Sequence, residues 1–395
     1  MNNQNMGAVD MDDTPDVFEN EETWVGVRLD PNALQSSSHG LAALSHKTRG
    51  RGAQSNQSGR FETMRREAFD DGWETDDLPP LKTTVSLEKP KTIITRNQSP
   101  DISFDRSINA YRGCEHGCSY CFARPSHAYM GLSPGLDFET HLFAKPNAAL
   151  LLEQELAAPN YKPKVIAIGT NTDPYQPIER HHQITRQVLE VLDRTNHPVS
   201  IVTKSALVLR DIDILSSMAK RGLVRVALSV TTLDRKLARA MEPRASTPQK
   251  RLDAIRQLSH AGIPTSVMVA PIIPALNDCE IEGILNAAYD HGARDAGYVL
   301  LRLPLEVSEI FKQWLLEHYP DRYRHVLSLL RSMRGGKDYD MAWGQRMRGR
   351  GVYADQIAKR MRLATKRLGM KRRKEALRID LFTPPILPGS QMSLF

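Results

Sequence analysis

Residues 114–121 read Cys-Glu-His-Gly-Cys-Ser-Tyr-Cys and contain three of the four cysteines of the chain. Gly113 precedes this stretch and Gly117 lies inside it. Glycine lets the backbone turn tightly, so nearby side chains can converge on one point. Thiolates are soft ligands that suit iron–sulfur clusters or zinc. A cubane of four irons bound by three cysteines keeps one iron without a protein ligand, and that iron can bind a small molecule.

The spacing of Cys114, Cys118 and Cys121 is C-x3-C-x2-C, and the aromatic Tyr120 precedes the last cysteine. This pattern resembles the signature of the radical S-adenosylmethionine (SAM) superfamily. The resemblance implies that the cysteines bind a [4Fe–4S] cluster whose open iron chelates the amino and carboxylate groups of SAM. It also implies that an external one-electron donor reduces the cluster, which then cleaves SAM to a 5′-deoxyadenosyl radical.

Two other interpretations of the cysteines remain open. Together with His116 or His127 they would form a zinc site, although no second cluster of cysteine and histidine follows and Cys279 stands alone. A non-enzymatic iron–sulfur or zinc protein would use them only structurally. A disulfide framework is disfavoured, because only four cysteines occur in 395 residues and no secretory signal is recognisable.

The composition favours a folded cytoplasmic protein. Its hydrophobic fraction of 41% supports a sizeable core. The sequence contains no run of about 18 apolar residues, so no membrane span is expected. The first residues lack the charged and apolar regions of an export signal, so we expect a reducing cytoplasm in which thiols persist.

Charge is distributed unevenly along the chain. Residues 1–80 contain 7 Lys or Arg against 15 acidic residues, and they predict a disordered acidic arm. An Arg-Gly patch over residues 47–62 would either contact phosphates from a flexible backbone or pack against the rest of the chain. Residues 331–378 contain 16 Lys or Arg against 4 acidic residues, which favours an anionic partner or a solvated helical face.

Short apolar runs alternate with amphipathic helical patterns from about residue 107 to 305. This alternation predicts an α/β fold with a parallel sheet and helical crossovers. Six units match the partial (β/α)6 TIM-type barrel of radical SAM enzymes, which we place at residues 81–305. The expected strands are Ser107–Tyr111, Lys164–Gly169, Val199–Thr203, Val224–Val230, Thr265–Ala270 and Gly297–Leu301. The expected helices are Ala148–Leu156, Ile184–Arg194, Asp211–Arg221, Thr247–Ala261, Ile281–His291 and Glu306–Tyr319.

Polar residues follow several of these strands, where parallel barrels collect their chemistry. Asp173 follows the second strand and could accept a hydrogen bond from the amino group of SAM. Lys204 follows the third strand and could pair with the SAM carboxylate. Arg244, in Glu-Pro-Arg after the fourth strand, could bind a carboxylate with both arms of its guanidinium group.

The motifs Asp-Pro-Tyr-Gln-Pro, Thr-Lys-Ser and Glu-Pro-Arg after these strands resemble the spore photoproduct lyase-like branch of the superfamily. The resemblance covers about residues 105–305 and implies SAM contacts by Thr172, Asp173, Lys204 and Ser229. The lyases carry a hydrogen-donating cysteine near the end of the second strand, whereas this chain has no cysteine there. Tyr175 is a conjectural replacement for that hydrogen donor.

The C-terminal part is basic and then proline-rich. Residues 306–382 predict a basic helical region, whose cations suit phosphates and whose interleaved aromatic residues could stack on bases. Residues 383–395 read as a proline spacer followed by Gln391-Met-Ser-Leu394-Phe395. This end resembles the peptide by which bacterial repair and replication proteins bind the sliding clamp, with Leu394 and Phe395 filling an apolar pocket and Gln391 orienting the peptide.

These features predict a radical SAM enzyme, lyase-like or DNA-repair-like, that acts on nucleic acid, with DNA favoured. A radical SAM enzyme that modifies RNA or a protein is the second hypothesis. A non-enzymatic iron–sulfur or zinc protein is the third.

Overall fold

Six parallel strands form the centre of the fold in the computed structural model. The seven-stranded sheet has the order β10-β9-β8-β7-β6-β3-β2, and only β2 runs antiparallel to its neighbour. The two ends of this sheet, β10 and β2, are not paired with each other, so the barrel is partial. Its strands are β2 (Ile94–Arg96), β3 (Arg106–Ile108), β6 (Ile166–Ile168), β7 (Val199–Thr203), β8 (Val224–Ser229), β9 (Thr265–Ile272) and β10 (Asp295–Leu300).

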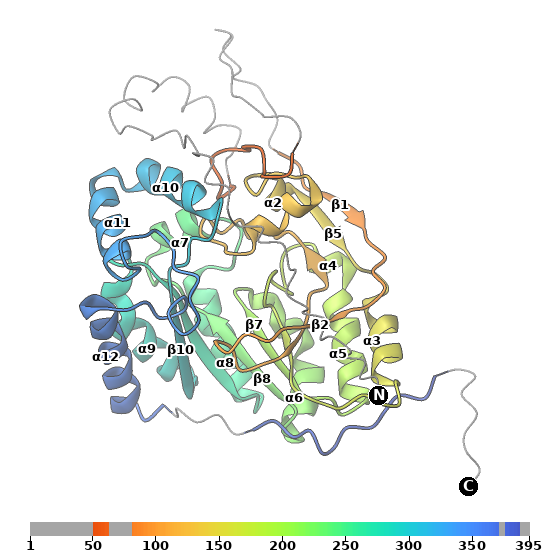
Figure 1. Ribbon diagram of the computed structural model, residues 1–395. Coiled ribbons are helices and arrows are strands. Elements are labelled where there is room, and N and C mark those ends of the chain that lie inside the picture. Colours follow the sequence, from red (N-terminus) through yellow and green to blue (C-terminus); the bar gives the residue numbers. More distant parts are fainter. Residues whose placement is uncertain (1–49, 63–80, 371–375, 388–395) are drawn as a thin grey trace, which may run out of the picture. The chain divides into compact units, whose positions relative to one another are not determined.

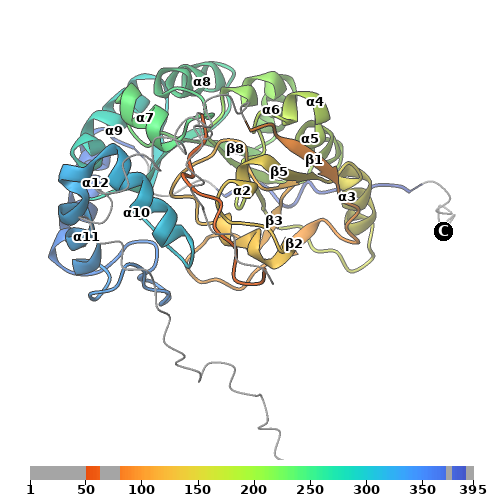
Figure 2. The ribbon, with the colours of Figure 1, turned by 90° about the horizontal axis from the view of Figure 1, so that it is seen from above.

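The structure describes residues 50–62, 81–370 and 376–387, all within one structural unit spanning residues 43–395. Helices α5, α6, α8 and α9 lie on the outer side of the curved sheet (Figures 1 and 2). The principal helices are α3 (Ala148–Leu156), α5 (Ile184–Arg194), α6 (Ile212–Lys220), α8 (Pro248–His260), α9 (Ile281–Asp290), α10 (Val307–His318), α11 (Tyr323–Ser332) and α12 (Val352–Arg367). Shorter helices are α2 (Asp137–Thr140), α4 (Glu179–His182) and α7 (Arg235–Met241).

The sequence explains why these elements form. Along α5, Ile184, Val188 and Leu192 recur at a spacing of four residues, and all three are buried. Such a spacing places apolar side chains on one face of a helix, which then packs on the sheet. Helix α8 begins after Thr247, whose side chain accepts a hydrogen bond from the backbone N–H of Lys250.

A second, three-stranded sheet has the order β1-β5-β4 and comprises β1 (Thr84–Leu87), β5 (His141–Ala144) and β4 (Tyr111–Arg112). The expected first strand is divided, because Tyr111 and Arg112 leave the main sheet and pair with β5. Residues 113–121 follow β4 directly. The cysteine-containing segment therefore starts from the small sheet, beside the carboxyl end of β3.

The predicted partial (β/α)6 barrel is confirmed. Strand β7 and helices α3 and α5 have the predicted bounds, and the other predicted elements differ by a few residues at their ends. Among the described helices, none is both long and apolar enough to cross a membrane.

Segments from both ends of the described chain pack on the barrel. Residues 50–62 do not fit the predicted disordered arm. They agree with the alternative in which the Arg-Gly patch packs against the rest of the chain, because Arg51, Gly52 and Ala53 are buried against the cysteine segment and its neighbours. Residues 376–387 run below β8 and α6 in Figure 1. There the N–H of Arg378 donates to the carbonyl oxygen of Gly222, and the N–H of Thr383 to that of Thr195.

Candidate active site

The cysteine loop, residues 113–121, is shaped by two glycines in the left-handed region. Gly113 has φ +74° and Gly117 has φ +67°, conformations that favour glycine. The N–H of Cys114 donates to the carbonyl oxygen of Phe138 at 2.9 Å, and that of Ser119 to Met241 at 3.0 Å. Bonds to two distant segments hold the loop in place.

The three thiols fit the ligand set of a cluster. All are free, Cys114 and Cys118 are buried, and Cys121 is partly exposed. Burial raises the pKa of Cys114 well above its usual range, and it raises that of Cys118 to about 12. The positive charge of Lys204 opposes the shift at Cys118. Apolar burial stabilises the protonated thiol, whereas a bound metal group would favour the thiolate that these sulfurs need as ligands.

The alternative zinc site is not formed by the described residues. Nδ1 of His116 lies 3.4 Å from a carboxylate oxygen of Asp173, and Nε2 of His127 lies 2.9 Å from the carbonyl oxygen of His141. Within residues 50–62, 81–370 and 376–387, no three His, Cys, Asp or Glu side chains are arranged to hold a metal ion. A four-iron cluster keeps its ligands apart around a cage, so the cysteines alone can hold it without converging on one ion.

The loop after β6 holds the cysteine loop from one side. The side chain of Gln176 accepts a hydrogen bond from the N–H of Glu115 at 2.9 Å and donates to the carbonyl oxygen of Gly113 at 3.2 Å. Asp173 accepts from the Thr203 hydroxyl at 2.7 Å and from the N–H of Lys204 at 2.7 Å. The motif Asp-Pro-Tyr-Gln-Pro thus ties together the cysteine loop and the end of β7.

Asp173 is ionised in this setting. Burial alone would raise its pKa, but His116 and the hydrogen bonds from Thr203 and Lys204 lower the pKa to about 2. Its oxygens also accept from the N–H of Tyr175 at 2.9 Å. With these four partners, a further bond to SAM would have to displace one of them, so its contact with SAM stays a prediction.

Tyr120 joins a buried ionic network. Its hydroxyl donates to Glu242, which also accepts from the Thr231 hydroxyl at 2.7 Å and pairs with Arg251. Arg251 donates to the carbonyl oxygens of Ser246 at 2.7 Å and Ser229 at 3.0 Å. The aromatic residue of the cysteine motif is therefore fixed by the glutamate of Glu-Pro-Arg.

Three predicted SAM contacts lie at the strand ends. The ammonium group of Lys204 lies 5.8 Å from the centre of the Tyr120 ring. Burial alone would lower the pKa of Lys204, but the nearby Cys118 and Glu242 raise it. Ser229 ends β8 and is buried, whereas the Thr172 hydroxyl donates to the carbonyl oxygen of Tyr111 at 3.2 Å. Lys204 therefore lies beside the cysteine loop, Ser229 lies at the end of β8, and Thr172 is already bonded within the protein.

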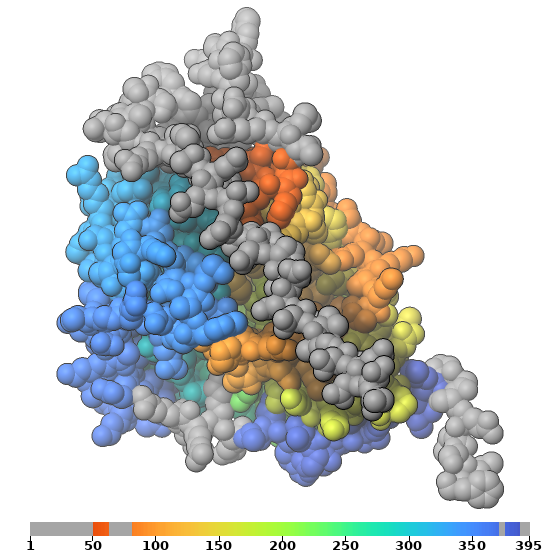
Figure 3. Space-filling view, in the orientation of Figure 1, coloured from red at the N-terminus to blue at the C-terminus, as the bar shows by residue number. Residues whose placement is uncertain are grey.

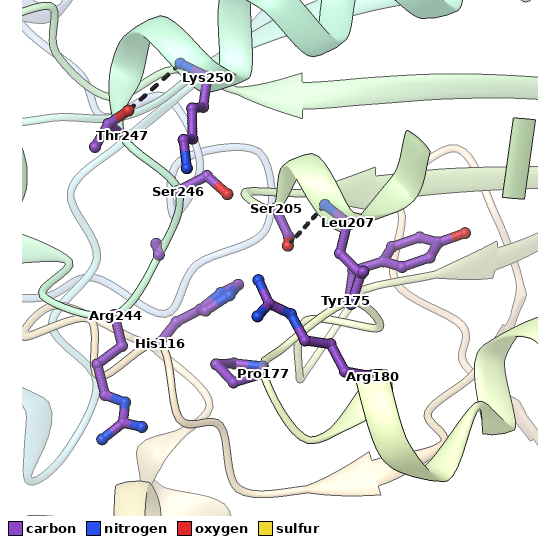
Figure 4. A pocket seen from close by; sticks show the side chains of 11 residues that line it. His116, Tyr175, Pro177, Arg180, Ser205, Leu207, Arg244, Ser246, Thr247 and Lys250 are labelled. Atoms are coloured by element: carbon purple, nitrogen blue, oxygen red, sulfur yellow. Dashed lines mark hydrogen bonds between the residues drawn. The ribbon is translucent and has the colours of Figure 1, made fainter. Parts of the chain in front are cut away.

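A cationic cavity, defined by the residues in Figure 4, opens beside the cysteine loop and has a volume of about 210 Å³. Arg180, Arg244 and Lys250 line it together with His116, and no carboxylate does so among the described residues. Arg244 pairs with Glu115 at 3.1 Å. The remaining polar lining comes from three hydroxyl groups, those of Ser205, Ser246 and Thr247.

Among the described residues, Arg180 and Lys250 form no ion pair, and their exposed side chains point into the cavity (Figure 4). Thr247 is the N-cap of α8, and this end of a helix carries partial positive charge. The cavity is therefore suited to an anionic group.

The Tyr175 side chain points away from His116 and Arg244 (Figure 4). It is 1% exposed, and its ring lies 5.9 Å from the guanidinium carbon of Arg210. Burial raises the pKa of Tyr175 well above its usual range, and the Asp211 carboxylate adds to the shift. Hydrogen donation by Tyr175 stays a prediction that this orientation does not favour. Residues 169–172, the stretch without the cysteine of the lyases, begin with Gly169, where a Cβ would lie 2.0 Å from the carbonyl oxygen of Val202.

Sequence reasoning did not identify Arg124, Glu139 or Gln176. Arg124 is fully buried and donates to the carbonyl oxygen of Cys118 at 2.9 and 2.8 Å. It also pairs with Glu139 at 2.5 Å. Charged side chains are usually exposed, so neither residue stood out in the sequence; only their proximity to the cysteine motif was a signal.

Several arginines of the basic C-terminal region bind within the protein and are not available to a partner. Arg334 is buried and donates to carbonyl oxygens, including that of Leu301 at 2.8 Å. Arg346 pairs with Asp101 at 2.6 Å and lies 4.2 Å from the centre of the Trp343 ring. The cationic surface is therefore smaller than the composition suggests. Residues 371–374 and the peptide containing Gln391, Leu394 and Phe395 lie outside the described residues.

The comparisons with known proteins agree with this geometry. Residues 108–288 match the family model of the radical SAM superfamily. An uncharacterised protein of Mycobacterium tuberculosis is 36% identical over 230 residues, which cover 57% of this chain and 68% of the relative. An uncharacterised protein of Methanocaldococcus jannaschii is 30% identical over 220 residues, which cover 55% and 78%.

The fold is also similar to that of a solved spore photoproduct lyase in complex with a dinucleoside spore photoproduct. The TM-score is 0.53 at 17% sequence identity, and the match covers 72% of this chain and 79% of the lyase. At this identity the similarity concerns the fold.

Proposed function

Because this chain belongs to the radical SAM superfamily, we propose that it cleaves SAM reductively and acts on nucleic acid, with DNA as the first candidate substrate. Superfamily membership implies a [4Fe–4S] cluster and SAM, and Cys114, Cys118 and Cys121 would hold the cluster. When bound and reduced by an external one-electron donor, this cofactor pair supplies a 5′-deoxyadenosyl radical.

The chain's own residues would position the reactants. Arg124 and Gln176 fix the backbone of the cysteine loop, and Tyr120 is held by Glu242. We assign Lys204 to the SAM carboxylate, because its ammonium group lies beside Tyr120 and is held charged by Cys118 and Glu242. Ser229 would add a hydroxyl contact from the end of β8.

The cationic cavity is the observation that supports an anionic polymer as the substrate. Arg180 and Lys250 both line the cavity, and no ion pair involves either of them among the described residues. A phosphate bound there would lie next to His116, which belongs to the cysteine loop. The similarity in fold to a lyase bound to a dinucleoside lesion supports DNA over RNA and over a protein.

The first experiment measures the chemistry. The protein is reconstituted anaerobically with iron and sulfide, reduced, and given SAM with or without DNA carrying defined lesions. We expect 5′-deoxyadenosine to form, to increase when the correct DNA is present, and to vanish in Cys118→Ala. Equal cleavage with and without every DNA tested would contradict the proposed DNA substrate, and stimulation by RNA alone would favour an RNA-modifying enzyme.

The second experiment tests the cavity. Each phosphate contact to duplex DNA contributes about 0.9 to the slope of log K against log salt concentration. Arg180→Gln combined with Lys250→Gln should therefore lower the slope by up to about 2. Lys220→Gln is the matched control, because Lys220 is exposed at the C-terminal end of α6. An unchanged slope in the double variant would contradict phosphate binding in the cavity.

A further inference from the structure

A segment far from the cysteines in sequence covers the outer side of the cysteine loop. Residues 51–57, which we call the strap, form no helix or strand, yet Arg51 and Ala53 are among the buried residues. The strap is part of the red segment in Figures 1 and 3, at the surface beside α2. A segment without regular structure needs specific partners if its polar groups are to be buried.

At Gly52 the backbone of the strap lies directly against the backbone of the cysteine loop. A Cβ atom at this position would lie 1.6 Å from the carbonyl oxygen of Gly117 and 3.2 Å from the backbone nitrogen of Ser119. Gly117 lies between the first two cysteines, and Ser119 follows the second. Only glycine fits here, because the two backbones meet without space for a side chain.

Glu139 connects the strap to the cysteine loop electrostatically. Its fully buried carboxylate accepts hydrogen bonds from the N–H groups of Gly52 at 3.0 Å and Ala53 at 2.9 Å. The same carboxylate pairs with Arg124, which donates to the carbonyl oxygen of Cys118. The carboxylate of Glu139 thus binds the strap backbone directly, and through Arg124 it is connected to the backbone of Cys118.

Arg51 fixes the strap on its other side. Its guanidinium group donates to the carbonyl oxygens of Glu139 at 2.9 Å and Leu81 at 2.8 Å, and to the Thr83 hydroxyl at 3.0 Å. Thr83 in turn donates to the carboxylate of Glu115 in the cysteine loop at 2.6 Å. The planar guanidinium group satisfies three acceptors at once, which an ammonium group would not do in the same geometry.

The strap continues along neighbouring elements. Asn56 and Asp137 of α2 exchange hydrogen bonds of 2.7 and 3.0 Å, and the Ser55 hydroxyl donates to Gln313 of α10 at 2.8 Å. These contacts anchor the strap at both of its flanks.

We propose that Arg51 and Gly52 are positioning residues for the iron–sulfur cluster, and that the strap keeps the cysteine loop in its ligand-presenting conformation and shields it from solvent. The proposal rests on the cluster implied by superfamily membership and is independent of the substrate. Weakening the strap should leave the barrel folded and make the bound cluster labile.

The test compares Gly52→Ala and Arg51→Met with two matched controls in the full-length chain. Arg60→Met removes an arginine of the same segment that pairs with Glu306 at the surface. Gly283→Ala adds a Cβ that meets only Leu233, at 3.7 Å. Each protein is reconstituted anaerobically, and its iron and sulfide content, its electron paramagnetic resonance spectrum and the rate of cluster loss to an iron chelator are measured.

Arg51→Met removes three hydrogen bonds, and Gly52→Ala forces two touching backbones apart. A loss of about 1.4 kcal/mol or more corresponds to a factor of about ten, so we expect cluster loss about tenfold faster or more in both strap variants. The controls should stay within about twofold of the wild type, and circular dichroism should show a folded barrel in all four variants. Arg51→Lys should restore retention only in part. Wild-type cluster content, spectrum and loss rate in folded Gly52→Ala and Arg51→Met would overturn the proposal.

Discussion

Replacing Arg251 with methionine should lower the free energy of unfolding by about 4 kcal/mol. Removing one member of a buried ion pair leaves the charge of the other member buried without compensation. Arg251 and Glu242 are both at most 2% exposed. The substitution also removes the donors to the carbonyl oxygens of Ser246 and Ser229. Glu242 would keep its bonds from Tyr120 and Thr231 but lose its charge partner.

The pH dependence of this stability loss shows whether the unpaired charge of Glu242 causes it. Burial alone would raise the pKa of Glu242, but Arg251 and then Lys204 lower it in the native protein. Without Arg251 the pKa must be higher, so the folded variant takes up a proton at a higher pH than the folded wild type. The stability gap between the two proteins should therefore narrow as the pH falls, since the protonated carboxyl no longer needs a cation.

Urea unfolding of the metal-free proteins at several pH values measures this gap. Arg256→Met is the matched control, because Arg256 is exposed on the same helix and pairs with Asp253 at the surface, a pair worth about 0.5 kcal/mol. The double variant Glu242→Gln with Arg251→Met should be more stable than Arg251→Met alone. A loss below about 1 kcal/mol, or a gap that does not depend on pH, would refute the reasoning.

Three further predictions concern single features of the fold. Asp173→Asn should cost about 2 kcal/mol at neutral pH, and this cost should disappear as the pH falls from about 4 towards 2, since the lowered pKa favours the folded state only above that range. Burial lowers the pKa of His197 to about 4, so stability should fall between about pH 6.5 and 4, and His197→Gln should reduce that fall. Deleting residues 391–395 should abolish binding to a bacterial sliding clamp and leave SAM cleavage unchanged.

Urea titrations across pH measure the first two of these predictions, and a binding assay with purified clamp measures the third. An equal cost of Asp173→Asn at pH 7 and pH 3 would contradict its assignment as an ionised acceptor. If His197→Gln loses as much stability between about pH 6.5 and 4 as the wild type, a group other than His197 takes up the proton. Undiminished clamp binding after the deletion would end the idea of a clamp peptide.

The barrel was predictable because its signals are local. Apolar residues in α5 repeat at helical spacing, and β7 alternates buried and half-buried residues, so both patterns predict the observed bounds. The small sheet was not predicted in full. Strand β5 is only four residues long and pairs with β1, which is more than fifty residues away in sequence, and no local pattern specifies such a pairing.

The site was predictable where chemistry restricts residue type. Three cysteines at a fixed spacing have few roles, so the sequence predicted a cluster at this loop. Asp173 was noticed for its charge, but the sequence did not show that it binds His116, Thr203 and the backbone of Lys204. Which ligand a polar residue contacts depends on distances that only the fold determines.

The strap shows the opposite case. The sequence left open whether the Arg-Gly patch that contains the strap binds phosphates or packs against the rest of the chain, and it did not show that Gly52 meets Gly117 across a contact of two backbones. Such a contact uses no side chain, so composition and periodicity carry no signal of it. Burial of Arg51 has a different origin, since the three acceptors of its guanidinium group come from residues 81, 83 and 139, which are distant in sequence.

The segment of residues 376–387 has a geometric consequence for partners. It is anchored at Thr195 and Gly222, which precede β7 and β8, whereas the cationic cavity lies beyond the opposite ends of these strands. A partner bound by residues that follow this segment would be tethered near the amino-terminal ends of these strands. Such a partner and a substrate at the mouth would occupy separate ends of the molecule. The two binding sites would then not compete. Tethering the partner to this chain would raise the local concentration of the substrate near the partner, and of the partner near the substrate.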